Sequence, residues 1–302
     1  MNMPSFMGSI QYRISVKSTA APDPSTRKPK FRLPPLACDA HCHVFGPAAK
    51  FPYAPAAAYW PPDAPFEQLK KLHDTLGIER AVIVHASCHG ADMRVTLDAV
   101  ARSNGRYRGT AIVDESYGDR EFQKMHDAGI RGVRFNFVKH LGGRPDLSFF
   151  KKTTDRVRSL GWHLILHLDS NDLVEFKDLF MKLPVPMVID HMGRVKAADG
   201  LEQKPFQVLL GFMRNANCWA KVCGAERVSS KGPPFTDALP FARALIEAAP
   251  ERILWGTDWP HPNVGKHMPN DADLVELFAQ MAPEPALQHK ILVDNPARLY
   301  GF

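Results

Sequence analysis

Two histidines separated by a single residue, His41 and His43, lie at the end of an apolar stretch of this chain. Side chains two residues apart on a β-strand point to the same side, so we expect both imidazoles to face one point. Asp258 ends another apolar stretch far downstream. Two imidazoles and a carboxylate are the donor set of a divalent metal site, or of an acid–base site for hydrolysis.

Two further histidines, His167 and His191, follow apolar stretches in the same way. With His41, His43 and Asp258, His167 would complete a His/His/His/Asp shell of the kind that zinc or manganese accepts. His191 is a second candidate catalytic group beside Asp258, which we expect to act as general base. The alternative is that the histidines are hydrogen-bonded core residues and that Asp258 caps a loop.

Anion-binding candidates follow other apolar stretches. Arg134 and Arg227 could each hold a substrate carboxylate through two parallel hydrogen bonds, although a salt bridge in the wall of the fold is the alternative for each. Tyr59, Ser87 and His140 are further candidates for substrate contacts, with a structural role as the alternative. Together these residues indicate a small anionic substrate.

The elements that must position these residues are eight short apolar stretches, which alternate with segments of helical spacing. The stretches are 36–44, 80–86, 107–113, 132–138, 162–169, 186–191, 218–223 and 253–258. This alternation predicts a parallel sheet of the α/β class, and eight strands suit a closed (β/α)8 TIM barrel. An open doubly wound sheet is the alternative, but no G-x-G-x-x-G follows the first strand.

The polar candidates follow the ends of these strands, where the active site of such a barrel forms. The predicted helices are 65–76, 93–103, 117–128, 148–160, 171–181, 204–215 and 236–249, with more helix after residue 262. Residues 1–34 are predicted to form an arm that is poorly structured or packed on the surface. Residues 35–302 are predicted to form the barrel.

Composition excludes several classes of protein. The chain has 302 residues and a formal charge of +6, without a dense Lys/Arg run, so we expect no nucleic-acid partner. No apolar run approaches the ~20 residues that cross a bilayer, so we expect no membrane partner. Five scattered cysteines without a C-x-x-C pair favour reduced thiols and a cytoplasmic location. The oligomeric state is left open.

Other histidines receive no functional role at this point. We expect His163, at the start of its strand, to be structural. We expect five others to be surface or loop residues: His73, His126, His261, His267 and His289. The chain also lacks the G-x-S-x-G nucleophile motif and the G-x-x-x-x-G-K-[ST] phosphate loop.

Several of these motifs together resemble the amidohydrolase superfamily. The resemblance rests on the segments 39–47 (DAHCHVFGP), 189–194 (IDHMGR) and 255–263 (WGTDWPHPN), with 86–90 and 131–137 in support. It runs from about residue 36 to residue 300. It implies a distorted (β/α)8 barrel of amidohydrolase type and, within the superfamily, hydrolysis of a lactone that carries carboxylate groups.

The resemblance also implies residue roles. Asp258 would activate water, and His41, His43 and His191 would surround the carbonyl. Four residues fall where such lactonases hold their substrate: Tyr59, Ser87, Arg134 and Arg227. Metal-dependent members use a histidine at the position of His167 as a ligand, whereas the metal-free lactonases have a tyrosine there. His140 replaces an arginine of those lactonases.

The sequence therefore predicts a hydrolase that opens the ring of a small carboxylated or sulfonated lactone with one divalent ion, zinc or manganese. Three alternatives stay open. The first is a metal-free lactonase of the 2-pyrone-4,6-dicarboxylate type, and the second is a metal-dependent decarboxylase of a muconate-like acid. The third is a barrel that binds a ligand without catalysis.

Overall fold

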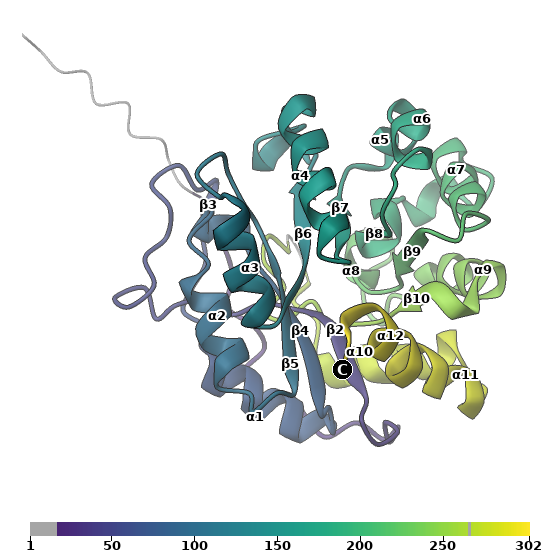
Figure 1. Ribbon diagram of the computed structural model, residues 1–302. Helices are drawn as coiled ribbons and strands as arrows, with labels where there is room; N and C mark the ends of the chain where they lie inside the picture. The colour runs from purple at the N-terminus through teal and green to yellow at the C-terminus, as the bar shows by residue number, and fades with distance from the viewer. Residues whose placement is uncertain (1–16, 265–266) are drawn as a thin grey trace, which may run out of the picture.

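The computed structural model describes residues 17–264 and 267–302, and its centre is an eight-stranded parallel sheet (Figure 1). Its strands are β2 (Cys38–Cys42), β4 (Arg80–Val84), β5 (Tyr107–Ala111), β6 (Ile130–Asn136), β7 (His163–His167), β8 (Met187–Ile189), β9 (Cys218–Lys221) and β10 (Ile253–Leu254). They neighbour one another in chain order from β2 to β10. Each strand falls within or overlaps one predicted stretch, and the prediction of a distorted (β/α)8 barrel is confirmed.

The first and last strands meet at a seam rather than in a regular ladder. There, the backbone N–H of Ala40 donates to the carbonyl of Trp255 at 2.8 Å, and the N–H of Asp258 donates to the carbonyl of His41 at 2.7 Å. These hydrogen bonds close the barrel. They also bring His41 and Asp258, from opposite ends of the chain, next to each other.

A glycine and a buried carboxylate hold the seam together. A Cβ on Gly256 would lie 2.4 Å from the His41 nitrogen and 2.7 Å from Asp39 Oδ1, so only glycine permits this approach. Asp39 accepts hydrogen bonds from the Thr257 N–H at 3.0 Å and from its hydroxyl at 2.6 Å. Asp39 also lies 3.2 Å from His73 Nε2. The seam is therefore fixed by specific polar contacts as well as by packing.

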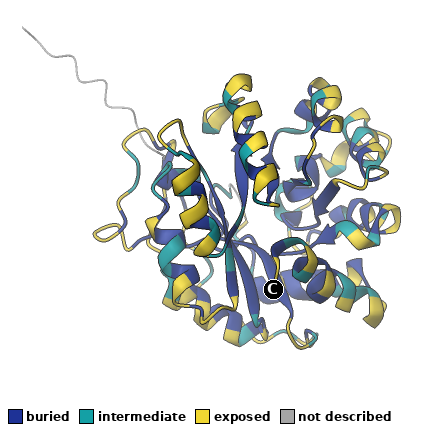
Figure 2. Cartoon of the chain, in the orientation of Figure 1, coloured by how far each residue is buried: buried dark blue, intermediate teal, exposed yellow. Residues whose placement is uncertain are grey.

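Helices cover the outside of the sheet, and their outer faces carry the exposed residues (Figures 1 and 2). The helices of the described residues are α1 (Phe66–Leu76), α2 (Arg94–Ala101), α3 (Asp119–Asp127), α4 (Leu147–Ser159), α5 (Ser170–Glu175), α6 (Lys177–Met181), α7 (Lys204–Phe212), α8 (Ala225–Val228), α9 (Leu239–Ala248), α10 (Asp271–Met281), α11 (Pro285–His289) and α12 (Asn295–Tyr300). The predicted segment 171–181 divides into α5 and α6 around Phe176.

The sequence explains why α1 forms where it does. Leu69, Leu72 and Leu76 recur at helical spacing and are buried against the barrel. Gly77 follows in the left-handed region with φ 81°, and its N–H donates to the carbonyl of His73. This is the usual way in which a glycine ends a helix.

The apolar core has two parts. The larger fills the space between strands and helices. The smaller contains residues from six of the strands, and α12 closes it: Cys38, Ala40, Val82, Ile165, Val188, Trp219, Leu254 and Tyr300. Except for Leu254, which ends the short β10, the strand residues among them come from the first and middle parts of their strands. The strand ends are therefore left for polar side chains, as expected for a barrel of this type.

The described part of the predicted arm lies against the barrel. β1 (Lys17–Ser18) pairs with β3 (Tyr59–Trp60), and Arg27 donates hydrogen bonds to Glu276 of α10 at 2.7 and 2.9 Å. Residues 1–16 of the predicted arm lie outside the described residues. In the part of the chain that is described, no helix has the length and apolar character needed to span a bilayer.

Candidate active site

Polar side chains that follow the strands gather around one cavity at the carboxyl end of the barrel. The cavity is narrow in this structure, with a volume of about 20 Å³, which is room for about one water molecule. Its lining residues are His43, Tyr59, Ser87, Arg134, His140, Leu141, His167, His191, Arg194, Arg227, Asp258, Pro262 and Asn263. All five residues predicted to bind substrate are among them, although their roles remain predictions.

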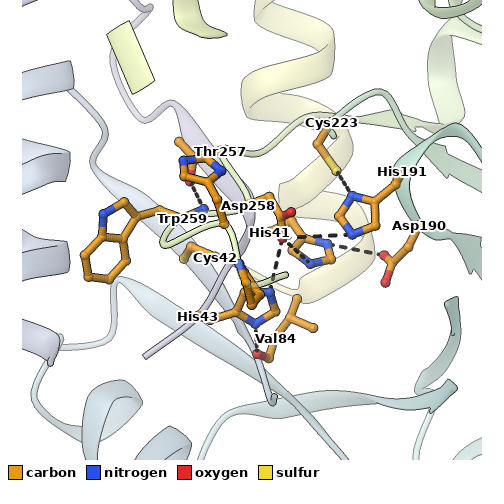
Figure 3. A network of polar contacts seen from close by, with 12 residues as sticks. His41, Cys42, His43, Val84, Asp190, His191, Cys223, Thr257, Asp258 and Trp259 are labelled. Atoms are coloured by element: carbon orange, nitrogen blue, oxygen red, sulfur yellow. Dashed lines mark hydrogen bonds and ion pairs between the residues drawn. The ribbon is translucent and has the colours of Figure 1, made fainter. Parts of the chain in front are cut away.

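The Asp258 carboxylate is the centre of the histidine cluster (Figure 3). Its Oδ1 lies 3.2 Å from His43 Nε2, 3.4 Å from His41 Nε2 and 3.9 Å from His191 Nε2. All four side chains are buried. The structure thus brings together the residues that the sequence singled out, and it places His41 behind the cavity rather than in its lining.

Two of these residues have an uncommon backbone conformation. Strand β10 ends at Leu254, earlier than predicted, and Asp258 lies on the following turn with φ 65°. His191 begins a run of four left-handed residues, 191–194, with φ from 50° to 67°. For residues other than glycine this conformation costs about 1–2 kcal/mol each. Strain of this kind concentrates at functional sites, where the surrounding structure maintains it.

Arg227 holds the second oxygen of Asp258. Its Nε and Nη2 donate to Oδ2 at 2.8 and 2.5 Å. Burial alone would raise the pKa of Asp258, but Arg227 and then His191 hold that pKa well below its usual range. Asp258 is therefore a carboxylate at neutral pH, and its Oδ1 faces the histidines.

A second buried carboxylate, Asp190, connects three basic side chains. It lies 3.1 Å from Arg134 Nη2, 3.2 Å from Lys221 Nζ and 3.3 Å from His41 Nδ1. Lys221 Nζ is also 3.0 Å from His41 Nδ1. Burial and then the Lys221 charge lower the pKa of His41 to about 4, so this imidazole is neutral at pH 7.

Our sequence reasoning missed Lys221, although a signal was present. A lysine within an otherwise apolar strand is rare unless its charge is paired. The sequence reasoning also assigned no role to Asp190 or Arg194, which belong to the same motif as His191, at 189–194. In the structure Arg194 lines the cavity, with Nη1 3.4 Å from His167 Nε2 and Nε 3.5 Å from Asp169 Oδ1.

These contacts make Arg194 the least neutralised of the three arginines in the cavity. Arg134 and Arg227 each lie within about 3.1 Å of a buried aspartate, whereas the carboxylate nearest Arg194 is farther away and partly exposed. An arginine with unused donors in a small cavity is suited to hold a carboxylate or sulfonate.

The donor set at Asp258 fits one divalent ion. His41, His43 and Asp258 each offer a ligand atom, all within 4.8 Å of one another. The His43 Nδ1–H donates to the carbonyl of Val84 at 2.7 Å, which leaves the Nε2 lone pair facing Asp258, an arrangement that a cation bound between the two would stabilise. His41 Nε2 has no hydrogen-bond partner among the described residues. Three donors and an open position are typical of catalytic zinc.

His167, the fourth predicted ligand, lies elsewhere. No group of three close ligand atoms within residues 17–264 and 267–302 includes it. Its ring centroid is 5.6 Å from that of His191, and its Nε2 faces Arg194. His167 therefore belongs to the cavity wall in this structure.

Two of the histidines expected to be surface or loop residues are buried; the expectation is wrong for His73, which is in a helix, whereas His261 does lie in a loop. His73 is on the apolar face of α1 and contacts Asp39 at the seam. His261 is buried with its Nε2 3.1 Å from Asp271 Oδ1. The spacing of His73 from Leu69, Leu72 and Leu76 could have indicated its burial.

The chain belongs to the amidohydrolase family, whose model matches residues 38–302. This membership agrees with the resemblance seen in the sequence, and the prediction that the chain is a hydrolase is confirmed. The chain is 48% identical over 282 residues to 2-pyrone-4,6-dicarboxylate hydrolase of Comamonas testosteroni, covering 90% of this chain and 92% of that protein. It is 45% identical over 274 residues to 4-sulfomuconolactone hydrolase of Rhizobium radiobacter, with coverage of 90% and 92%.

Solved structures agree with the fold. The crystal structure of a probable 2-pyrone-4,6-dicarboxylic acid hydrolase from Acinetobacter baumannii, with citric acid bound, superimposes with a TM-score of 0.79. It is 28% identical to this chain and covers 88% of this chain and 100% of its own.

Proposed function

We propose that this enzyme hydrolyses the ring ester of a small lactone that carries carboxylate or sulfonate groups. The observation that carries the proposal is a buried, ionised Asp258 whose free oxygen faces three imidazoles, in a small cavity that three arginines line. The names of the two curated relatives, both lactone hydrolases, support the same substrate class.

The charges at the cavity favour an anionic substrate. Arg134, Arg194, Arg227 and Lys221 bring four positive charges to the cavity and its wall, against the buried carboxylates Asp190 and Asp258. A third buried carboxyl group, Glu226, lies 3.4 Å from Arg227, and burial raises its pKa. Arg194 is the primary anion-binding residue in this proposal, and Arg134 and Arg227 contribute the donors that remain after their aspartate contacts. Tyr59, Ser87 and His140 would contact the rest of the substrate. Such contacts hold the ring ester beside Asp258 and convert binding energy into orientation.

Hydrolysis then uses the two oxygens of Asp258 differently. Arg227 holds Oδ2, while Oδ1 accepts a proton from water as the water oxygen attacks the lactone carbonyl carbon. The Nε2–H of His191 donates to the oxyanion that forms on the carbonyl oxygen. When the carbonyl re-forms, the ring C–O bond breaks. Asp258 returns its proton to the departing oxygen, giving the open-chain hydroxy acid or its keto form.

We also propose that His41, His43 and Asp258 hold one divalent ion, zinc or manganese. When bound there, such an ion polarises a carbonyl or lowers the pKa of water. Lys221 and Arg227 beside two of the ligands disfavour a cation electrostatically, so the metal-free version of the reaction remains the alternative. Metal analysis of the purified, active protein tests this part. Full activity with less than about a tenth of an equivalent of metal would contradict it.

A substrate screen tests the reaction itself. Carboxylated and sulfonated five- and six-membered lactones are incubated with the protein, and ring opening is followed by ultraviolet absorbance. In heavy-oxygen water, hydrolysis places one labelled oxygen in the product carboxylate. Release of carbon dioxide without such labelling would identify a decarboxylase of a muconate-like acid instead and would overturn the proposal.

All five cysteines are unpaired and buried, which is consistent with a reducing compartment. A cytoplasmic location is therefore part of the proposal, to be tested by fractionation of the producing cell. The proposal involves no nucleic acid and no membrane.

A further inference from the structure

The buried thiol of Cys223 contacts His191 from the side opposite Asp258. Cys223 follows β9, and its Sγ lies 3.3 Å from His191 Nδ1 (Figure 3). The other ring nitrogen, Nε2, faces Asp258 Oδ1 at 3.9 Å. The imidazole is thus in contact with a different polar group at each of its two nitrogens.

The backbone next to Cys223 closes the remaining space around this ring nitrogen. A Cβ on Gly224 would lie 2.6 Å from His191 Nδ1, which only glycine avoids. His191 itself is held in the left-handed conformation with φ 51°. The ring therefore has little freedom to turn, and its proton distribution depends on the two contacts that it makes.

We propose that Cys223 is a positioning residue whose S–H donates to Nδ1 of His191 and so places the imidazole proton on Nε2. The opposite arrangement would direct the Nε2 lone pair at a carboxylate and the Nδ1–H at sulfur, which is a weak acceptor. The proposed arrangement is favourable at both ends of the ring. Burial also raises the pKa of the Cys223 thiol, which keeps its proton available.

This inference rests on the proposed function, in which His191 Nε2–H stabilises the oxyanion. A neutral imidazole that carries its proton on Nδ1 would turn a lone pair toward that developing negative charge. Fixing the tautomer before substrate binds means that the donor is in place when charge forms, which is the property that makes such groups effective.

A nucleophilic role for the thiol is the alternative, since a cysteine beside a histidine can form a covalent intermediate. Cys223 is only 2% exposed and is not among the residues that line the cavity. The imidazole ring separates its sulfur from Asp258, and a lactone carbonyl in the cavity would lie beyond that ring. This placement favours positioning over attack.

Three variants test the proposal. Cys223→Ala removes the donor, Cys223→Ser replaces it with a hydroxyl, and Cys218→Ala removes a buried thiol from the same strand far from the cavity. Because Cys223→Ala loses one neutral hydrogen bond, we expect its kcat to decrease roughly three- to tenfold. Its KM should stay within about twofold of wild type. Cys223→Ser should recover most of the rate, and Cys218→Ala should keep the wild-type rate.

A direct readout is the two-bond ¹H–¹⁵N correlation spectrum of the imidazoles, which reports the nitrogen that carries the proton. The His191 signals are assigned by their loss in His191→Gln. We expect the Nε2–H form in wild type and a mixture of tautomers in Cys223→Ala. An unchanged spectrum together with an unchanged kcat would overturn the inference. Loss of all turnover in both Cys223→Ala and Cys223→Ser, with folding retained, would indicate a nucleophile and would also overturn it.

The spectrum also separates this inference from the proposed function. If His191→Gln hydrolyses lactones at the wild-type rate, the catalytic role of His191 is wrong. The tautomer of His191 in the Cys223 variants would still decide whether the thiol controls the ring.

Discussion

The two ends of the barrel use similar residues for different purposes, and strand β7 shows this within five residues. His163 begins the strand, packs its ring 5.0 Å from that of Tyr300, and has no hydrogen-bond partner among the described residues for either ring nitrogen. His167 ends the same strand, lines the cavity and faces Arg194. Position along the strand, rather than residue type, thus separates a packing histidine from a candidate functional one.

Strands β8 and β9 repeat the pattern. Val188 and Trp219 belong to the apolar cluster at the beginning of the strands, whereas Asp190 and Lys221, two residues further on, form a buried ion pair behind the cavity. The amino ends of the strands therefore stabilise the fold, and their carboxyl ends carry the charged residues. Variants at the two ends should separate stability from turnover.

The largest expected effect is at Asp258. Asp258→Asn keeps the shape of the side chain but cannot accept the proton of water, so kcat should fall by about a thousandfold or more. Steady-state kinetics on the lactone found by the screen measures this, with circular dichroism to confirm the fold. A rate within tenfold of wild type would show that another group is the base.

The second largest effect is expected at His191, the proposed hydrogen-bond donor to the oxyanion. His191→Gln should lower kcat by roughly a hundredfold, because a preorganised donor to the oxyanion is lost or displaced. KM should change little. Equal losses in binding and turnover would instead indicate that His191 holds the ground state of the substrate.

A smaller effect is expected on binding at Arg194. Arg194→Met keeps the apolar stem but removes the charged hydrogen bonds to the substrate anion, so KM should rise roughly ten- to a hundredfold. Arg144→Met is the matched control, because Arg144 is exposed and its contacts, an ion pair with Glu175 and the face of the Phe176 ring, lie outside the residues that line the cavity. If Arg194→Met lowers kcat and leaves KM unchanged, the anion is bound elsewhere.

The smallest effect on turnover is expected at the other end of the barrel. Burial lowers the pKa of His163 to about 3 in the folded protein, whereas in the unfolded chain it is near 6.5. The unfolded state therefore takes up this proton first as the pH falls below about 6.5, and the free energy of unfolding decreases toward pH 3. His163→Leu should make the melting temperature less dependent on pH over this range.

Turnover of His163→Leu should stay within about twofold of wild type, since His163 does not touch the cavity. The melting temperature of both proteins is recorded by calorimetry from pH 7 down to pH 4. His41 and His85 also have lowered pKa values, near 4 and 3, so the pH dependence should decrease rather than disappear. A pH dependence as steep as that of wild type would contradict the prediction.

Sequence patterns predicted the architecture well because apolar strands and amphipathic helices alternate clearly in this chain. They also located His41, His43, His191 and Asp258 at one end of the barrel. They missed the contacts that come from the turns after the strands, such as the left-handed run that presents His191. They also missed the partners of the charged residues, since pairing of Arg134 with Asp190 is a tertiary contact that no local spacing encodes.

Strand β2 gives a second example of a contact that could not be predicted from local sequence. In a regular strand Asp39 and His41, two residues apart, would share a side of β2, but the register shifts between Asp39 and Cys42. Asp39 consequently contacts His73 of α1, while His41 contacts Lys221. A bulge of this kind depends on the partner strand and is invisible in the strand's own sequence.

The seam has a consequence for the protein during its synthesis. His41 and His43 leave the ribosome early, but β10 and the turn after it, which carries Asp258, arrive only after most of the chain has been made. Since the hydrogen bond between Asp258 and His41 is itself part of barrel closure, no nascent chain that ends before Asp258 contains the complete site. Hydrolytic activity should therefore appear only when the barrel closes. A chain that is terminated before Asp258 should not act on metabolites of the cell.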